Sequence, residues 1–351
     1  MPEAGNKKQV FSGVQPTGKL HLGNYIGALS QWVENQTRYD NIFCIVDLHA
    51  LTIAEAVRPA LLREKTREVA ALYLACGVDP EKSIVFVQSH IPAHAELTWI
   101  LNCVTTVGWI ERMTQYKSKA AQVESVSTGL LDYPVLQAAD ILLYRTDLVP
   151  VGEDQKQHIE LTADIAHRFN RLFGEAFVIP QPLLRAEGAR IMGFDDPMTK
   201  MSKSRGEIQK GHAIGLLDSA DTIREVILGA VTDSSMETHF DHASPAVRNL
   251  LTIYEVLSGR TRLEIEAHFE GKGYNYLKRE VADVVINRLA PIRNRYLEIN
   301  RDRAYLECIL QRGAERAWTI AESTLRHVQE LVGIGPWASR KTDCPPGNIG
   351  R

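Results

Sequence analysis

The sequence predicts an α/β protein with a parallel sheet, a helical insertion and an all-helical C-terminal third. Three short apolar runs of β type, 9–11, 41–46 and 83–88, alternate with helical patterns over about 22–37 and 58–76. This alternation is typical of a βαβαβ core. After residue 206 no strand pattern returns, and we expect helices over about 215–230, 245–258, 261–270, 275–299 and 302–332. Between these parts the pattern is helical over 93–106, 108–116 and 133–145.

Length and composition limit the classes of protein that this chain can belong to. With 351 residues, 44% hydrophobic and 24% charged, it is long enough for two domains of ordinary composition. No apolar run approaches the ~20 residues of a membrane span, and residues 1–8 lack the apolar centre of a secretory signal. The five cysteines are odd in number and widely spaced, which argues against a disulfide framework, a zinc site or an iron–sulfur cluster. We therefore expect a cytoplasmic protein with no membrane partner.

The charge is unevenly distributed. The net charge of −3 is not that of a protein that coats nucleic acid, and we expect no DNA partner. Residues 259–351, however, carry 16 Lys and Arg against 12 Asp and Glu, whereas the remainder carries 24 against 31. A mildly basic C-terminal third is compatible with a selective RNA contact, although most such charges lie on solvated helix faces.

A glycine-rich turn near the N-terminus carries the first candidate site. The stretch from Phe11 to Gly27 passes from a strand through a Pro-Thr-Gly turn into a helical pattern. The N-terminus of a helix after such a turn offers free N–H groups to an anion such as phosphate. His21 and Asn24 are three residues apart and share a helix face, where they could bind phosphate or ribose oxygens. The alternative is an ordinary first βα unit with a surface histidine.

A second motif makes that alternative less favoured. The five residues Lys-Met-Ser-Lys-Ser occupy positions 200–204. In a chain of this length such a run arises by chance with a probability on the order of 10⁻⁴. Lysine provides a movable positive charge and serine a hydroxyl donor, both suited to binding a polyphosphate.

The two motifs together resemble the paired signatures of the class I aminoacyl-tRNA synthetases. Gly-Val-Gln-Pro-Thr-Gly (13–18), Ala-Ala-Asp-Ile-Leu-Leu-Tyr (138–144) and Val-Pro-Val-Gly-Glu-Asp-Gln-x-Gln-His (149–158) resemble the tryptophan branch of bacteria and organelles. The resemblance covers about residues 9–335. It implies a Rossmann-like catalytic domain over 9–206 with a helical insertion at about 93–147, and a helical anticodon-binding domain over 207–335. The breaker-rich tail, 336–351, is predicted to be disordered.

The resemblance also implies the reaction and its partners. We expect L-tryptophan to be attached to tRNA(Trp) through tryptophanyl-adenylate, with ATP as substrate, Mg²⁺ accompanying ATP, and a homodimer as the assembly. The residues implied in catalysis are His21, Asn24, Lys119, Lys200 and Lys203. Those implied in ATP binding are Gln15, Pro16, Thr17, His21, Gly23, Asn24, Gly152, Glu153, Asp154, Ile191, Lys200, Met201, Ser202, Lys203 and Ser204. Lys119 lies in a polar segment, 117–129, that we expect to be a loop.

Asp140 is the residue we expect to recognise the amino acid. On the predicted helix 133–145, the polar residues Tyr133, Gln137, Asp140 and Tyr144 recur every three or four positions between apolar ones. A carboxylate among core positions needs a partner because its burial is otherwise costly. His49 follows the strand 41–46, at the edge where parallel sheets bind ligands. The tryptophan-binding set is Phe11, Gly13, Gln15, His49, Gln137, Asp140, Val149, Val151 and Gln155.

Several alternatives stay open at this point. Gln137 stands where some members of the branch carry methionine, and a Gln-x-x-Asp pair also occurs in tyrosine enzymes, so a tyrosine-specific relative is one alternative. A synthetase-like paralogue that binds without charging tRNA is another, although His21, Lys200 and Lys203 are all present. His90 and His94 lie four apart on either side of Pro92, and we interpret them as structural residues, not as a metal pair. At the last position of the first signature, the asparagine found here, Asn24, is the residue that is usual in the tryptophan branch.

Overall fold

The computed structural model describes residues 7–121, 123–152, 155–184, 190–202, 206 and 209–335. Within them, five strands form one fully parallel sheet in the order β3–β2–β1–β4–β5. Their bounds are β1 Gln9–Val14, β2 Asp40–Ile45, β3 Ser83–Val87, β4 Leu148–Val151 and β5 Gln181–Leu184. The strand order runs outward in both directions from β1 and β4, as in a Rossmann-like sheet. Ligands of such sheets bind at the carboxyl ends of the strands where the order reverses.

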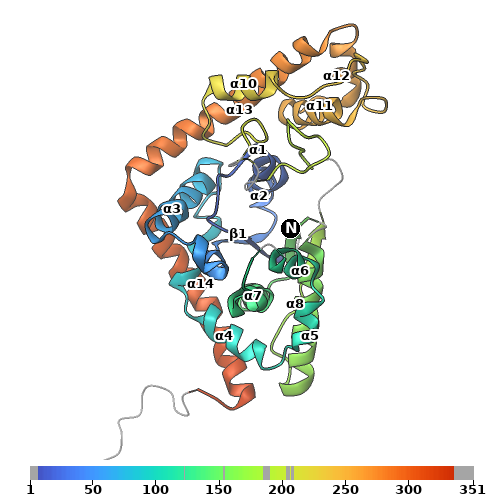
Figure 1. Cartoon of the computed structure of the whole chain (residues 1–351). Coiled ribbons are helices and arrows are strands. Elements are labelled where there is room, and N and C mark those ends of the chain that lie inside the picture. The colour runs from blue at the N-terminus through green and yellow to red at the C-terminus, as the bar shows by residue number, and fades with distance from the viewer. Residues whose placement is uncertain are drawn as a thin grey trace, which may run out of the picture.

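The two faces of the sheet are buried in two apolar clusters. Along β2, Phe43 and Ile45 belong to one cluster, while Ile42 and Cys44 belong to the other. All four side chains are fully buried, which explains why the strand reads as a continuous apolar run in the sequence. Helix α3 (Pro59–Ala75) packs on one face, and α7 (Thr128–Leu142) and α8 (Lys156–Phe173) lie on the other (Figure 1).

The first predicted helix, 22–37, is not continuous. It consists of α1 (Leu22–Asn24), a π-helical turn (Tyr25–Leu29) and α2 (Ser30–Asn35). In the π turn, Tyr25, Ile26 and Leu29 are all buried. A π turn widens the helix, which lets more of a local run face the core than a regular α-helix of this length would.

The insertion contains more helix than the sequence predicts. Its elements are α4 (Ala93–Asn102), α5 (Val107–Glu111), α6 (Thr114–Ala120) and α7. The predicted loop 117–129 is therefore wrong over its first residues, because Lys119 lies on α6. The ammonium group of Lys119 lies 4.0 Å from the centre of the Tyr133 ring. Packing against α7 thus stabilises a short helix that its polar composition does not predict.

The sequence also predicts a last short strand at 190–192 and a helix over 155–173, and the structure differs at both. The strand expected at 190–192 does not join the sheet; Met192 forms only an isolated bridge with Lys200. The backbone N–H and C=O of Met192 bond to the Asn249 side chain, so they need no strand partner. The fifth strand is β5, which the sequence analysis missed. Helix α8 begins at Lys156 with Gln155 at its N-cap, and α7 ends before Tyr144.

The C-terminal helices form two groups. Helices α10 (Ala220–Leu228), α11 (Pro245–Ser258) and α12 (Arg262–Phe269) gather at one end of the molecule. Helix α13 (Tyr274–Arg301) runs from them back toward the sheet, and α14 (Arg303–Val332) continues along it (Figure 1). None of the helices in the described ranges has the length and apolar character that a membrane crossing requires.

Helix α14 contacts the backbone of the edge strand β3. The guanidinium of Arg316 donates hydrogen bonds to the carbonyls of Pro80 (2.8 Å) and Ser83 (3.2 Å). A Cβ atom placed on Gly313 would lie 1.8 Å from the Val85 carbonyl oxygen. Only glycine lets the helix approach the strand this closely.

We predict that Gly313→Ala lowers the free energy of unfolding by about 2 kcal/mol or more, since overpacking typically costs ~1–3 kcal/mol and backbone cannot move aside easily. This loss would exceed the gain of about 1 kcal/mol that alanine brings to a helix. Chemical denaturation of the purified protein measures the difference. Gly108→Ala on α5 is the control, because its Cβ would meet no atom within 4 Å and only the helix gain applies. Equal stability of the two variants would contradict the close approach.

Candidate active site

The first signature lies where β1 ends and α1 begins. His21 has an extended backbone at the N-cap of α1, and its carbonyl accepts hydrogen bonds from the N–H groups of Asn24 and Tyr25. The Asn24 side-chain oxygen in turn accepts from the His21 N–H, at 3.1 Å. The structure therefore brings His21 and Asn24 together on the first turn, as the spacing predicts.

The second signature meets the first directly. Met201 is buried, its N–H donates to the Ile191 carbonyl, and its Cβ lies 3.6 Å from the position of a Cβ added to Gly23. The glycine therefore leaves room for Met201 to pack against the first turn of α1. Lys200 is exposed and Ser202 half-buried beside it. Lys203, Ser204, Glu153 and Asp154 lie outside the described residues.

A backbone segment that follows the second signature in the chain pairs with the first signature, and no sequence pattern indicates this pairing. The Leu22 N–H donates to the Ile214 carbonyl (2.8 Å), and the Leu216 N–H donates to the Leu20 carbonyl (2.9 Å). Between them His21 and Gly215 form an antiparallel bridge. This pairing lies outside the main sheet and joins segments that are nearly 200 residues apart in the sequence. No local sequence pattern therefore predicts it.

Asp140 is the centre of a buried hydrogen-bond cluster. Asp140 is 1% exposed, and its Oδ2 lies 2.8 Å from His49 Nε2. Its Oδ1 lies 2.6 Å from both Gln88 Nε2 and His94 Nδ1. Because a carboxylate only accepts, the two histidine nitrogens are the donors. The other nitrogen of His94 lies 2.8 Å from the Tyr144 hydroxyl.

This cluster keeps Asp140 ionised. Burial by itself would raise the pKa of the carboxyl group, but the hydrogen bonds and charges of His49 and His94 outweigh it and lower the pKa to about 2. The site therefore contains a fixed negative charge at neutral pH. This charge lies next to the residues that follow the carboxyl ends of β2 and β3.

Other residues of the predicted amino-acid set surround Asp140. The Phe11 ring stacks on Tyr144, with centroids 5.6 Å apart, and the Gln15 amide donates to the His49 carbonyl at 3.4 Å. Gln137 is half-buried one helical turn before Asp140, and Val149 and Val151 are buried on β4. Gln155 lies at the N-cap of α8 and Gly13 on β1.

The known family whose sequence profile matches is described as tRNA synthetases class I (W and Y), and the match covers residues 3–290. This chain belongs to that family. It is 52% identical over 329 residues to the tryptophan–tRNA ligase of Wolinella succinogenes, covering 93% of this chain and 99% of that protein. It is also 52% identical to that of Gloeobacter violaceus, covering 94% and 97%.

Solved structures give the same result for the fold. The tryptophanyl-tRNA synthetase of Mycoplasma pneumoniae superposes with a TM-score of 0.85 at 33% identity, covering 94% of this chain and 98% of that one. That of Campylobacter jejuni, solved with ADP and tryptophan, superposes with a TM-score of 0.80 at 35% identity, covering 93% and 100%. Both likenesses extend over the sheet and the C-terminal helices.

Two residues that contact Asp140 in the candidate site were not predicted from the sequence as site residues. Gln88 directly follows β3, and the rule that ligand-binding residues follow parallel strands could have indicated it. The interpretation of His94 as a structural residue agrees with its full burial, but its contact with Asp140 also makes it part of this cluster. The strand-end rule does not indicate His94, because this residue lies on α4 and not at the end of a strand.

The remaining basic residue of the predicted catalytic set is held nearby on α6. Lys119 contacts the Tyr133 ring, and the Tyr133 hydroxyl lies 3.0 Å from His158 Nε2. Burial lowers the pKa of Lys119 and raises that of Tyr133 to about 12. Among the described residues, no three His, Cys, Asp or Glu side chains are grouped so as to hold a metal ion.

We predict that Asp140→Ala lowers the free energy of unfolding by about 3–5 kcal/mol, the usual cost of removing one partner from a buried charged cluster. Three buried donors would lose their acceptor. Asp132→Ala is a control on the same helix: that half-buried carboxylate accepts one hydrogen bond, from Asn102, so its loss is expected to cost about 1 kcal/mol. Urea denaturation measures the free energy of unfolding of both variants. Equal losses of stability would show that the Asp140 cluster contributes no more than a single half-buried hydrogen bond.

Proposed function

We propose that this chain attaches L-tryptophan to tRNA(Trp) in two steps, with ATP as the energy source. One observation carries the proposal. Met201 of the second signature packs against Gly23 of the first, and the ionised Asp140 is bonded to His49 and Gln88, which follow strands β2 and β3 of the same sheet. The relatives named as tryptophan–tRNA ligases, at about half identity over nearly the whole chain, support the choice of amino acid.

In the first step the tryptophan carboxylate attacks the α-phosphorus of ATP, and pyrophosphate leaves. This chemistry needs in-line positioning and donors for the leaving oxygens, but no protein nucleophile. His21 and Asn24 lie together at the first turn of α1 and would bind phosphate or ribose oxygens. Lys200, bridged to Met192, and Lys119 on α6 would supply positive charge, and we expect Lys203, which lies outside the described residues, to add to it. Mg²⁺ would accompany ATP, and because the described residues group no three metal-binding side chains, ATP oxygens would provide most of its ligands.

In the second step a ribose hydroxyl of the terminal adenosine attacks the carbonyl carbon of the adenylate. The new ester bond forms as the acyl–phosphate bond breaks, AMP leaves with the bonding electron pair, and the hydroxyl proton passes to a phosphate oxygen of the adenylate or to water. The ionised phosphate of the leaving group makes this displacement easy once the two reactants are aligned. The residues of the protein therefore act here mainly by holding the adenylate.

Asp140 is suited to select tryptophan by accepting the indole N–H. Its Oδ1 already accepts two hydrogen bonds, from Gln88 and His94, whereas Oδ2 accepts one, from His49. A carboxylate offers about four lone-pair positions, so one position on Oδ2 is left for a ligand. Indole nitrogen is only a donor, and it therefore complements an ionised carboxylate.

Pyrophosphate exchange with each amino acid in turn tests this function. We expect exchange with tryptophan and little with phenylalanine or tyrosine, together with charging of tRNA(Trp) in an aminoacylation assay. In Asp140→Ala, the preference for tryptophan over phenylalanine, expressed as a ratio of kcat/KM values, should fall by about tenfold or more, since an unpaired buried acceptor costs ~1–3 kcal/mol. This ratio does not depend on the fraction of enzyme that is folded.

Asp132→Ala is the control for selectivity and should keep the wild-type ratio. Preferred exchange with tyrosine would favour a tyrosine-specific relative. Exchange without charging of any tRNA would favour a binding paralogue. An unchanged ratio in Asp140→Ala would remove Asp140 from amino-acid selection without affecting the rest of the proposal.

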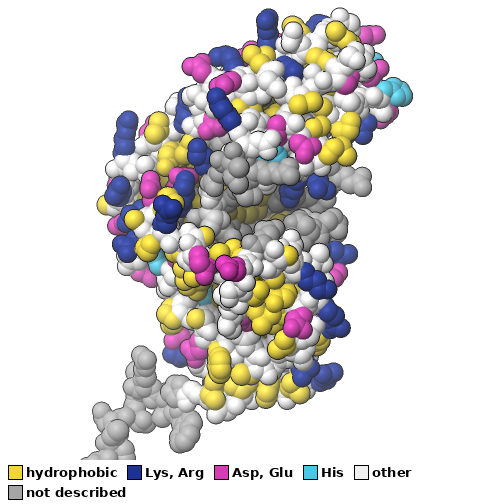
Figure 2. Space-filling view, viewed as in Figure 1, with side chains coloured by type: hydrophobic (Ala, Val, Ile, Leu, Met, Phe, Trp, Pro, Cys, Tyr) yellow, Lys and Arg dark blue, Asp and Glu magenta, His cyan; other side chains and the backbone are white. Residues whose placement is uncertain are grey.

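The domain division remains a proposal: a catalytic domain over 9–206, with an insertion at 93–147, and an anticodon-binding region over 207–335. On the face in Figure 2, Lys and Arg side chains are spread over both ends of the molecule and do not form one patch. Such a distribution suits selective contacts with a folded tRNA more than a general coat on nucleic acid. Because α14 contacts β3, cutting the chain after residue 206 would also uncover the sheet.

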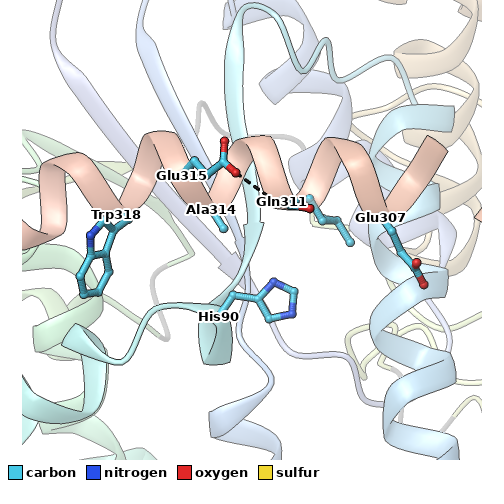
Figure 3. A pocket seen from close by; sticks show the side chains of 7 residues that line it. His90, Glu307, Gln311, Ala314, Glu315 and Trp318 are labelled. Atoms are coloured by element: carbon cyan, nitrogen blue, oxygen red, sulfur yellow. Dashed lines mark hydrogen bonds between the residues drawn. The ribbon is translucent and has the colours of Figure 1, made fainter. Parts of the chain in front are cut away.

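The cytoplasm is the compartment that fits this function, and a homodimer is the assembly that the family resemblance implies. Two apolar features favour self-association. Trp99 on α4 is 71% exposed. A groove of about 720 Å³ lies between α14 and the turn at His90, and Trp318 and Glu307 extend from the helix on either side of that histidine (Figure 3). Gln329 of α14 donates to Glu96, which places α4 beside α14.

We predict that Trp99→Glu weakens the dimer at least tenfold, because a buried interface indole would be replaced by a charge. Analytical ultracentrifugation of the wild type and the variant measures the association. Leu263→Glu is the control: this side chain is 80% exposed on α12, at the opposite end of the molecule, and its variant should remain a dimer. A monomeric wild type would contradict the dimer itself.

A further inference from the structure

A buried histidine–aspartate contact lies at the base of the segment that carries Lys200. His212 Nδ1 is 2.6 Å from Asp195 Oδ1. The His212 side chain is 0% exposed and that of Asp195 20%. Since a carboxylate only accepts, Nδ1 is the donor. Among the described residues Nε2 has no hydrogen-bonding partner, so Asp195 alone fixes the orientation of the ring.

The backbone around this contact is built to accommodate the ring. A Cβ atom on Gly193 would lie 2.4 Å from the His212 ring, so only glycine leaves space for it. The Phe194 N–H donates to the His212 carbonyl at 3.2 Å, which adds a main-chain bond beside the side-chain one. The Gly193 N–H donates to the Thr199 carbonyl at 2.8 Å, closing the turn that leads to Lys200.

The contact connects the two signatures through short lengths of chain. Two residues after His212, the Ile214 carbonyl accepts from Leu22 in the first turn of α1. Five residues after Asp195 comes Lys200, which is bridged to Met192. Movement of residues 209–216 relative to residues 191–202 would therefore change the position of Lys200 relative to His21. Asn249 fixes Met192 to α11, but it makes no link to the first signature.

We infer that His212 and Asp195 are positioning residues for adenylate formation, and that their hydrogen bond sets the register between the first signature and Lys200–Ser202. The inference rests on the proposed function. A lysine stabilises the leaving pyrophosphate only if its charge lies where negative charge develops, and displacements of about 1 Å can cost a large part of the rate. Tryptophan binding depends on the Asp140 cluster, which shares no residue with this contact.

The test is single-turnover formation of tryptophanyl-adenylate with the full chain. His212→Ala and Asp195→Ala should each slow this step about tenfold, while the Kd for tryptophan stays within about twofold of the wild type. The double variant should be no slower than either single one, because the residues act as one unit. Transfer from preformed adenylate to tRNA should keep its rate.

Two further variants separate positioning from stability. Asp195→Asn keeps an acceptor oxygen at the same place, so its adenylation rate should stay within about threefold of the wild type. Lys210→Ala removes a fully exposed ion pair with Glu225 from the same segment and should change nothing. If an alanine variant does not fold, the comparison of Asp195→Asn with the wild type in Tm and adenylation rate still decides.

The results that would overturn the inference are specific. They are wild-type adenylation by folded alanine variants, rate losses that multiply in the double variant, an equal loss in Asp195→Asn, or a tryptophan affinity that falls with the rate. A wild-type chain that forms no adenylate with tryptophan would instead refute the proposed function. The two failures are therefore distinguishable.

Discussion

The hydrogen bonds that converge on the Asp140 carboxylate join four elements that are distant in the chain. They come from the turn after β2 (His49), the turn after β3 (Gln88), and α4 (His94), and they meet on α7. A buried charge must be matched by donors, because leaving it unmatched costs several kcal/mol. Each donor belongs to a different element, so satisfying one charge also fixes the ends of two strands against the helical insertion. Stability and the shape of the pocket depend here on the same bonds.

The parts of this arrangement that the sequence predicts are those with short-range signals. The strands over 9–11, 41–46 and 83–88 are apolar runs bounded by breakers, and the structure confirms them. His21 and Asn24 are three residues apart, so any helix beginning at Leu22 must place them on one turn. Asp140 is flanked by core positions, which indicates a buried carboxylate. In each case the information lies within one turn or one strand.

The parts that the sequence does not predict depend on contacts between distant segments. Residues 190–192 have the composition of a strand, but the Asn249 side chain takes the backbone bonds that a neighbouring strand would have formed. Helix α6 is stabilised by Tyr133, and the π turn by burial of Tyr25, Ile26 and Leu29. The pairing of 214–216 with 20–22 has no periodicity to reveal it. Local propensity is overridden wherever a tertiary partner offers a better bond.

The contact between α14 and β3 has a consequence for synthesis on the ribosome. The sheet is encoded before residue 185, yet the side chain that bonds the Pro80 and Ser83 carbonyls is Arg316, near the end of the chain. An uncovered edge strand is a template for pairing with another chain. While more than a hundred residues are still to be translated, the edge strand β3 of the nascent sheet is uncovered. The catalytic half of the molecule is therefore complete only after α14, the last helix, has been translated. Occupancy of that edge by a chaperone during translation would protect the chain until α14 emerges.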